Sequence, residues 1–300
     1  MSGDFYHEPV LLNEAISMLL CNTDSCRSKV YVDCTLGGGG YTRKILEETP
    51  DDFKVIAIDR DGNSIRHSKE ALSVFSERII FVKDNFSNIQ NIIGRSLKSD
   101  VNPKVCGIVL DLGLSTYQLD YEEGFSYQKD TSLDMRAGED TELTAADVLN
   151  NSGEKDLIKI FKEYGELKYY RQITRDIIEY RKQKKFETTG EIVEVLRKKI
   201  PPRYLNKDLS KVFQALRIAV NDELENLKMV LEGSVNSLEP GARIAAVSYH
   251  SLEDRIVKNF FRLNKDLKAV TKKPVTASER EIESNSRARS AKLRAAEKTL

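Results

Sequence analysis

Three aspartates, Asp33, Asp59 and Asp111, each end a short apolar run and are the residues best placed to do chemistry. A carboxylate can pair with a cationic amine, accept hydrogen bonds from ribose hydroxyls, or accept from a reacting amine. Asp59 follows Gly39 by 20 residues, the distance at which a doubly wound fold presents an acidic residue to a ribose. His250 also ends an apolar run, where a histidine can be either structural or catalytic.

Four consecutive glycines, Gly37–Gly40, lie between Asp33 and a stretch of helix-forming residues from Tyr41 to Glu48. A strand, a glycine turn and a helix form the first half of a nucleotide-binding βαβ unit. Without Cβ atoms, such a turn lets backbone N–H groups approach a ligand. A tight turn without a ligand is the alternative, but four glycines are more than a turn requires.

The glycine spacing helps to choose among cofactors. Nicotinamide dinucleotides favour G-x-G-x-x-G/A, and here Thr42 and Arg43 occupy the third glycine position. The phosphate-binding motif G-x-x-x-x-G-K-[ST] is missing, which excludes that class of NTPase. S-adenosylmethionine has an amino-acid end, a ribose and an adenine, and suits Asp33 and Asp59 better. A dinucleotide-dependent oxidoreductase and a non-catalytic RNA-binding factor remain the rival classes.

The elements around these residues alternate between apolar strands and amphipathic helices, which predicts an α/β fold with a parallel sheet. Asp61, just before Gly62, is better placed than Asp59 to cap the following helix. The predicted strands are 30–33, 54–59, 79–82, 105–110 and 243–247. A further strand is predicted near 267–271. Residues 288–298, in the basic C-terminal segment, look helical by propensity, but fold analogy would make part of them an edge strand, and we predict the strand.

The alternation stops between Ser115 and Leu209, where only helical patterns occur. We therefore predict a core formed by residues 1–114 and 210–300, interrupted by a mainly helical subdomain at 115–209. Within it, Lys168–Lys185 holds seven basic and two acidic residues among several tyrosines. Basic residues interleaved with aromatic ones suit phosphates and unstacked bases. A solvated helix face is the alternative.

The composition excludes several classes of site. Acidic and basic residues number 47 each, so net charge alone does not indicate a nucleic-acid partner. Four cysteines and three histidines show no metal-ligand spacing. We expect neither a metal site nor a disulfide framework, and a reducing compartment. The N-terminus has no signal-peptide pattern and no apolar run is long enough to span a membrane, which predicts a soluble cytoplasmic protein.

Several longer motifs carry a specific resemblance. They run in order along nearly the whole chain: His7-Glu-Pro-Val-Leu-Leu12, Asp33-Cys-Thr-Leu-Gly-Gly-Gly-Gly40, Ala57-Ile-Asp-Arg-Asp61, Leu110-Asp-Leu-Gly-Leu-Ser115, Gln118-Leu-Asp120, Gly124-Phe-Ser126, Leu133-Asp-Met-Arg136, Phe213-Gln-Ala-Leu-Arg-Ile218, Asn221-Asp-Glu-Leu224, His250-Ser-Leu-Glu-Asp-Arg255 and Arg287-Ala-Arg-Ser290. With these motifs the sequence resembles the RsmH (MraW) family of bacterial small-subunit rRNA cytosine-N4-methyltransferases.

The resemblance implies a class I, Rossmann-like S-adenosylmethionine-dependent methyltransferase sheet with an inserted helical substrate domain. The implied reaction methylates N4 of one cytidine in the decoding region of 16S rRNA, within the small ribosomal subunit. The implied cofactor positions, quoted with their numbers in this sequence, are Gly39, Gly40, Tyr41, Asp59, Phe86, Asp111 and Gln118. Tyr41 departs from the histidine that the family often has there.

Two residues are candidates for catalysis. Asp111 lies where amino-methyltransferases place an acceptor for the reacting amine, although it could instead hold the cofactor. His250 is the second candidate. No metal or membrane partner is expected, and the oligomeric state, with a homodimer among the options, is left open by the sequence.

Overall fold

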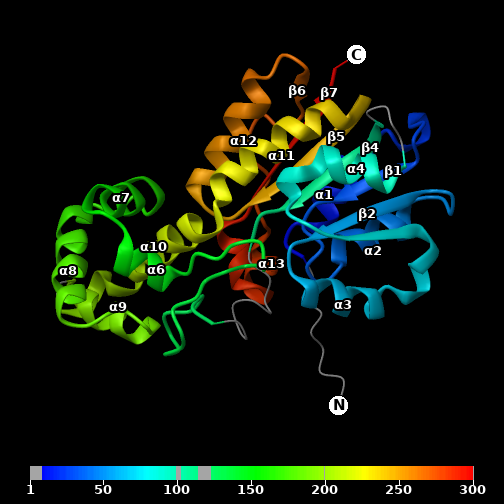
Figure 1. Cartoon of the computed structure of the whole chain (residues 1–300). Helices are drawn as coiled ribbons and strands as arrows, with labels where there is room; N and C mark the ends of the chain where they lie inside the picture. Colours follow the sequence, from blue (N-terminus) through cyan, green and yellow to red (C-terminus); the bar gives the residue numbers. More distant parts are fainter. Residues whose placement is uncertain (1–8, 99–102, 114–122, 199, 300) are drawn as a thin grey trace. The chain divides into compact units, whose positions relative to one another are not determined.

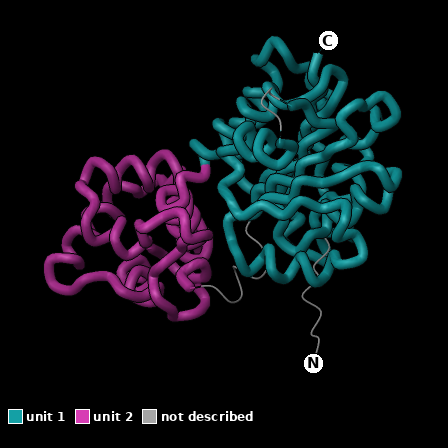
Figure 2. Tube along the Cα trace, turned by 45° about the vertical axis from the view of Figure 1, so that its right-hand side comes forward, with its two compact units in different colours: residues 1–113, 224–300 teal, residues 114–223 magenta. Residues whose placement is uncertain are grey.

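The computed structural model describes residues 9–98, 103–113, 123–198 and 200–299. The chain forms two compact units, drawn in different colours in Figure 2. Unit 1 comprises residues 1–113 and 224–300, and unit 2 comprises residues 114–223. The second unit is therefore an insertion in the first.

Unit 1 is built on a seven-stranded sheet in the order β3-β2-β1-β4-β5-β7-β6. The strands are β1 (Val30–Asp33), β2 (Lys54–Asp59), β3 (Ile79–Lys83), β4 (Val105–Asp111), β5 (Leu238–Ser248), β6 (Leu267–Ala269) and β7 (Lys292–Lys298). Strands β1 to β5 pair in parallel, and β7 runs antiparallel to both of its neighbours. Because the parallel strands end at one edge, Asp33, Asp59 and Asp111 all lie at that edge.

Helices cover both faces of this sheet (Figure 1). One face is covered by α1 (Leu12–Leu19), α2 (Gly40–Glu48) and α3 (Gly62–Ala71), and the other by α4 (Ile89–Ser96), α11 (Glu223–Ser237) and α12 (Ser251–Leu263). Alternate residues of β2 enter opposite cores, Val55 and Ala57 on one face and Ile56 and Ile58 on the other. Burial on both faces explains why the strands read as continuous apolar runs.

Shorter elements complete unit 1. They are η1 (Thr23–Ser25), η2 (Ser73–Arg78), η3 (Phe86–Asn88), α13 (Glu279–Ser284) and η5 (Ser286–Ser290). Helix α13 is tied to the N-terminal part of the unit, because Glu281 accepts a hydrogen bond from the backbone N–H of Leu11 at 2.7 Å. Among the described helices, none combines the length and the apolar composition needed to cross a membrane.

Unit 2 is helical, as the sequence predicts. It contains α6 (Ala145–Asn151), α7 (Glu154–Lys159), the π-helical turn η4 (Ile160–Tyr164), α8 (Tyr170–Gln183), α9 (Thr189–Arg197) and α10 (Pro202–Asn221). Capping boxes begin α6 at Thr144 and α9 at Thr188, which satisfies backbone donors that a helix leaves unpaired. The helices bury one apolar core of their own.

The second boundary lies at 223/224, whereas the sequence places it at 209/210. Apolar residues recur at helical spacing from Val212 to Val235. They lie on two helices, because Asp222 adopts a left-handed conformation (φ 48°) between α10 and α11. Val212 and Leu216 belong to the core of unit 2, while Leu227 and Leu231 belong to the core of unit 1. Helical periodicity alone does not reveal that one stripe serves two cores.

The C-terminal segment is a strand, as predicted, but not an edge strand. Strand β7 lies between β5 and β6, so β6 forms the edge. Arg294 of β7 is buried and donates to Asp254 of α12 at 2.7 Å, an ion pair that fixes the helix over this part of the sheet. Hydrogen bonding of β7 to β5 and β6 overrides the helical propensity of this part of the sequence.

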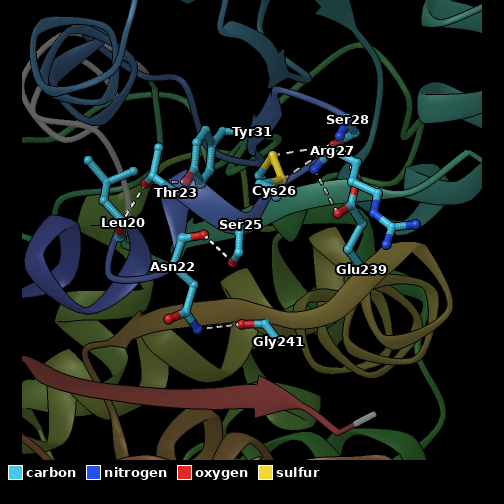
Figure 3. Close-up of a disulfide and its surroundings, with 11 residues drawn as sticks. Leu20, Asn22, Thr23, Ser25, Cys26, Arg27, Ser28, Tyr31, Glu239 and Gly241 are labelled. Atoms are coloured by element: carbon cyan, nitrogen blue, oxygen red, sulfur yellow. Dashed lines mark hydrogen bonds between the residues drawn. A yellow bond between two sulfur atoms is a disulfide. The ribbon is translucent and has the colours of Figure 1, made fainter.

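One expectation about the cysteines is wrong. Cys26 and Cys106 are joined by a disulfide, with Cα atoms 5.5 Å apart (Figure 3). The two residues are 80 positions apart in the sequence, and they meet only because the segment before β1 runs beside the start of β4. Cys21 and Cys34 are free. No local spacing could have predicted this pair.

Candidate active site

The glycine loop between β1 and α2 has a conformation that needs glycine. Gly37 and Gly39 have positive φ angles of 47° and 82°, and a Cβ on Gly39 would lie 2.8 Å from the side chain of Leu72. The hydroxyl of Ser68, on α3, donates to the carbonyl of Gly37 at 2.7 Å. Helix α3 therefore holds the loop, and Gly40 begins α2, whose first N–H groups have no partner within the helix.

Asp59 supports this loop directly. One oxygen of its carboxylate accepts from the backbone N–H of Gly37 at 2.9 Å, and the other accepts from the backbone N–H of Asp61 at 2.9 Å. Burial raises the pKa of Asp59 to about 6, and these two hydrogen bonds oppose the rise. Asp61, rather than Asp59, caps α3, as the sequence predicts. Its side chain accepts from the backbone N–H groups of Asn63 and Ser64.

Asp33 is fully buried and engaged by its own loop. Its carboxylate accepts from the hydroxyl of Thr42 at 2.7 Å and from the backbone N–H of Thr35 at 3.1 Å. Burial raises the pKa of Asp33 to about 6. The sequence suggests that this carboxylate pairs directly with a cationic amine, but it has no exposed surface for such a contact. It would favour a cation only through its charge.

Asp111, at the end of β4, has one carboxyl oxygen that no described residue hydrogen-bonds. Its backbone N–H donates to the hydroxyl of Thr35 at 2.7 Å, and the Tyr249 side chain and the backbone N–H of Gly113 lower the pKa of its carboxyl group. The Oδ1 atom is buried and has no hydrogen-bond partner among the residues that the structure describes. Burial, followed by the charges of Asp33 and Glu253, raises the pKa of Asp111 to about 7.

The other predicted cofactor residues have different environments. The Tyr41 side chain is buried, and its hydroxyl donates to the carbonyl of Val10 at 2.6 Å, so a cofactor role rests on its backbone N–H in the first turn of α2. Phe86 is half-buried at the start of η3 and packs beside the core under α4 and α11. Gln118 lies outside the described residues.

His250 caps helix α12. Its Nδ1 accepts from the backbone N–H of Glu253 at 3.4 Å, and the Glu253 carboxylate accepts from the backbone N–H groups of Tyr249 and His250. The Nε2 atom is 3.1 Å from the same carboxylate but has no hydrogen bond of acceptable geometry among the described residues. The structure gives this histidine a structural role, and its catalytic role stays a prediction.

Sequence reasoning missed Thr35, Thr42 and Tyr249. Thr42 donates to the carboxylate of Asp33 and Thr35 accepts from the backbone N–H of Asp111, while Tyr249 lowers the pKa of Asp111. The two threonines lie in the glycine-loop motif, and Tyr249 adjoins His250. Their closeness in sequence to predicted site residues was the only signal that could have identified them. What the sequence could not supply is the hydrogen-bonding geometry across neighbouring strands.

The edge of the sheet is thus anionic, with three raised carboxyl pKa values, beside a loop of backbone donors. This fits a ligand that carries both positive charge and hydroxyl groups, as S-adenosylmethionine does. Oδ1 of Asp111, which no described residue hydrogen-bonds, remains for a further donor. The strand order, with an antiparallel β7 between β5 and β6, and the glycine loop after β1 define a class I, Rossmann-like methyltransferase core.

The MraW methylase family model matches residues 4–299, and the chain belongs to that family. Family membership confirms the methyltransferase class and, with it, S-adenosyl-L-methionine as the methyl donor. The resemblance inferred from the sequence motifs is therefore confirmed.

Two relatives of this chain carry the same name. The chain is 45% identical over 316 residues to ribosomal RNA small subunit methyltransferase H of Carboxydothermus hydrogenoformans, covering 98% of both chains. It is 44% identical to the protein of that name from Clostridium botulinum, covering 98% of this chain and 99% of the other. Among solved structures, an rRNA methylase from Streptococcus thermophilus has a TM-score of 0.41 at 12% identity, covering 90% of this chain and 87% of the other.

Proposed function

We propose that this protein transfers a methyl group from S-adenosylmethionine to N4 of one cytidine in the decoding region of 16S rRNA. The small-subunit rRNA substrate is supported by the printed names of the relatives. The observation that carries the choice of an amine acceptor is the buried Oδ1 of Asp111 at the end of β4, which has no hydrogen-bond partner within the part of the chain that the structure describes. A carboxylate with one unused oxygen is suited to accept from an N–H group.

The chemistry requires such an acceptor. The lone pair of a cytosine amine is delocalised into the ring, so the amine is a poor nucleophile. S-adenosylmethionine supplies an electrophilic methyl group on a sulfonium. Asp111 would accept from the amine as its nitrogen attacks, which localises the lone pair, while the fixed backbone of β4 positions that acceptor.

The cofactor would be held by groups that the structure already orients. The backbone N–H groups of Gly39, Gly40 and Tyr41 lie at the loop and the start of α2, and Asp59 would accept from the ribose hydroxyls. Phe86 offers a half-exposed ring for the adenine. Two parts of this proposal rest on other grounds: Gln118 on the family resemblance, and a catalytic His250 on its position just after the end of β5.

Unit 2 would bind the rRNA through the basic residues of 168–185. Some of these residues have partners within the protein, which leaves fewer candidates for contact with phosphates. Arg181 is structural, because it donates to the carbonyls of Leu149 and Ser152 at 2.8 Å each. Lys182 and Lys184 pair with acidic side chains. The exposed members that remain are Lys168, Arg171, Arg175 and Lys185.

An exposed tyrosine accompanies these cations. Tyr169 precedes α8 and is 65% exposed, so it could stack with an unpaired base. Arg171 and Arg175 are four residues apart on α8 and therefore project from the same face. These exposed side chains offer RNA a small surface of phosphate-binding and stacking groups. Action on ribosomal RNA would place the protein in the cytoplasm, and a homodimer stays an untested alternative to a monomer.

The proposal is tested by identifying the modified nucleoside. Small subunits from a strain lacking this enzyme would be incubated with the protein and methyl-labelled S-adenosylmethionine, digested, and separated into nucleosides. We expect label in N4-methylcytidine. Label in a different nucleoside would overturn the N4 assignment, and an absence of label with correctly folded, cofactor-binding protein would favour a non-catalytic RNA-binding factor.

A further inference from the structure

The outer face of α12 and the edge strand β6 form a strongly basic part of unit 1. Residues 258–273 contain six basic side chains and one acidic side chain, although the whole chain contains 47 of each charge. The acidic one, Asp266, lies 3.2 Å from the ammonium of Lys298 and is therefore already paired. The six cations are exposed, and we call them the α12–β6 surface: Lys258, Arg262, Lys265, Lys268, Lys272 and Lys273.

These cations have no partners of their own. Within the part of the chain that the structure describes, none of the six side chains makes an ion pair or a hydrogen bond. Helix α11, on the same face of the sheet, differs, because its one lysine, Lys228, pairs with Glu225 at 2.9 Å. A solvated helix face ordinarily mixes its charges in this way. Unmixed cations indicate a surface suited to an anionic partner.

Helix α12 begins beside the candidate active site. It follows β5, which ends at Ser248, and β5 pairs with β4 so that Val247 lies opposite Asp111. A helix rises about 1.5 Å per residue, so Lys258 and Arg262 lie about 10 and 17 Å along α12 from its first residue. These two residues are four apart and project from the same face. The basic surface therefore leads away from the edge at which a base would be methylated.

The backbone that carries the later lysines is held in place. Strand β6 lies beside α12 and pairs with β7 (Figure 1). The N–H of Val270, just after β6, donates to the carbonyl of Ala295 at 2.9 Å. Val275 and Leu293 exchange two hydrogen bonds of 2.9 Å. The loop 271–274 is thus tied to β7 at both ends, and a fixed backbone reduces the conformational entropy that binding would cost.

Protection of the sheet edge explains only part of this charge. Lysine on an edge strand discourages pairing with another chain, and β6 is such an edge. However, Lys268 alone among the six cations lies within β6. Lys258 and Arg262 lie on α12, and the other three lie in the segments that flank β6. An anionic partner accounts for all six.

The side chains of this surface suit phosphates rather than bases. Five of the six are lysines, which bind phosphate as point charges. No aromatic ring is exposed within 258–273, all of which the structure describes, because Phe260 is half-buried against the core and Phe261 is buried. Unpaired bases are bound by stacking on exposed rings. The surface therefore fits the backbone of double-helical RNA better than a single strand.

We propose that the α12–β6 surface binds the phosphate backbone of a double-helical segment of the rRNA substrate, next to the nucleotide that is methylated. The inference rests on the proposed function, since rRNA is the substrate there. Contacts to phosphates position a nucleic acid without reading its sequence. The surface would therefore orient the substrate and add affinity, whichever base pairs the helix contains.

The first test is the salt dependence of binding to a transcribed 16S rRNA fragment that contains the decoding region. Each phosphate contact that is lost lowers the slope of log affinity against log salt by about 0.7–0.9. The triple variant Arg262→Gln, Lys265→Gln, Lys268→Gln should therefore lower the slope by about two to three units. An unchanged slope in the folded variant would overturn the proposal.

A control with the same change in net charge is available in unit 1. It replaces by glutamine three lysines that already pair with acidic side chains: Lys29, Lys44 and Lys228. This variant also loses three positive charges, but its slope should change by less than about one unit. Equal changes in the two triple variants would show an effect of net charge alone and would overturn the proposal.

The second test identifies the kind of RNA and needs no variant. Lysine acetylation of the protein, read by mass spectrometry, would be compared with and without the rRNA fragment. Lys265, Lys268, Lys272 and Lys273 should be protected, and Lys228 should not. Exchanging base pairs within the helical part of the fragment should leave the protection unchanged, whereas a single strand of equal length should protect less.

Other results of the acetylation experiment would overturn the proposal. These are a lack of protection by any RNA, equal protection by the single strand, and protection of Lys228 as strong as that of the four lysines. Protection by vesicles of anionic phospholipid, but not by RNA, would assign the surface to a membrane instead.

Neither measurement requires methyl transfer, so the two proposals can fail separately. Label in a nucleoside other than N4-methylcytidine would overturn the proposed reaction and leave this inference standing. Label in N4-methylcytidine, without protection of these lysines by the rRNA fragment, would overturn this inference alone.

Discussion

Replacing Asp59 by alanine tests the cofactor assignment at the residue that the structure defines best. In the structure its two carboxylate oxygens accept from the backbone N–H groups of Gly37 and Asp61, each at 2.9 Å. A second acceptor direction on each oxygen remains for ribose hydroxyls. Loss of a hydrogen bond to a charged acceptor costs about 1.5–3 kcal/mol, so S-adenosylmethionine should bind about 10- to 150-fold more weakly.

Calorimetry alone would not separate a ribose contact from support of the glycine loop, since Asp59 could provide both. We therefore suggest measuring S-adenosylhomocysteine and its 2′-deoxy analogue with the wild type and with Asp59→Ala. The wild type should discriminate against the deoxy analogue, and the variant should lose most of that discrimination.

Two results would refute the reasoning about Asp59. Unchanged affinity for S-adenosylmethionine in a folded variant would remove Asp59 from the site. Equal weakening of both analogues would show that Asp59 acts only through the conformation of the loop at Gly37. Asp61→Ala, which loses the cap of α3, serves as a control for general loosening of this region.

Two further predictions follow from the charges. Arg171→Ala and Arg175→Ala should each reduce the salt dependence of RNA binding by about one unit of slope. Lys54→Ala, at the start of β2 in unit 1, is the control and should leave the slope unchanged. Identical slopes in all variants would show that the α8 surface is only a solvated face. The carboxyl groups that end β1, β2 and β4 have pKa values raised to about 6, 6 and 7, and a cationic ligand favours their ionised forms. S-adenosylmethionine should therefore bind best above pH 7 and lose affinity as the pH falls through 7 and 6, by about tenfold for each carboxyl whose pKa it lowers by one unit. S-adenosylhomocysteine, with a neutral sulfur, should show a smaller loss, and equal pH dependence of the two ligands would contradict this account.

The sheet was predictable because its strands are buried on both faces and leave continuous apolar runs. The glycine loop and the acidic strand ends follow from the same pattern, so the site's location could be predicted as well. The position of β7 could not, because the placement of an antiparallel strand depends on non-local pairing with β5 and β6. For the same reason, the disulfide between Cys26 and Cys106 left no local signal.

The roles of the aspartates could be predicted only in part. The sequence indicates that Asp33, Asp59 and Asp111 end strands, but not which of their oxygens are already used. Both oxygens of Asp33 accept hydrogen bonds, from Thr35 and Thr42, whereas Oδ1 of Asp111 accepts none from residues 9–98, 103–113, 123–198 or 200–299. That difference depends on side-chain geometry in three dimensions, and it is what separates a structural carboxylate from the candidate acceptor.

The most direct test of the central claim is the single-turnover rate of Asp111 variants at saturating S-adenosylmethionine, with cofactor affinity measured alongside. If Asp111 accepts from the cytosine amine in the transition state, Asp111→Asn should lower the rate by about 10²-fold with little change in cofactor affinity. Asp111→Ala, which has no acceptor at all, should be slower still. A normal rate at saturating cofactor in the alanine variant, with weakened cofactor binding, would contradict the claim and assign Asp111 to holding the cofactor.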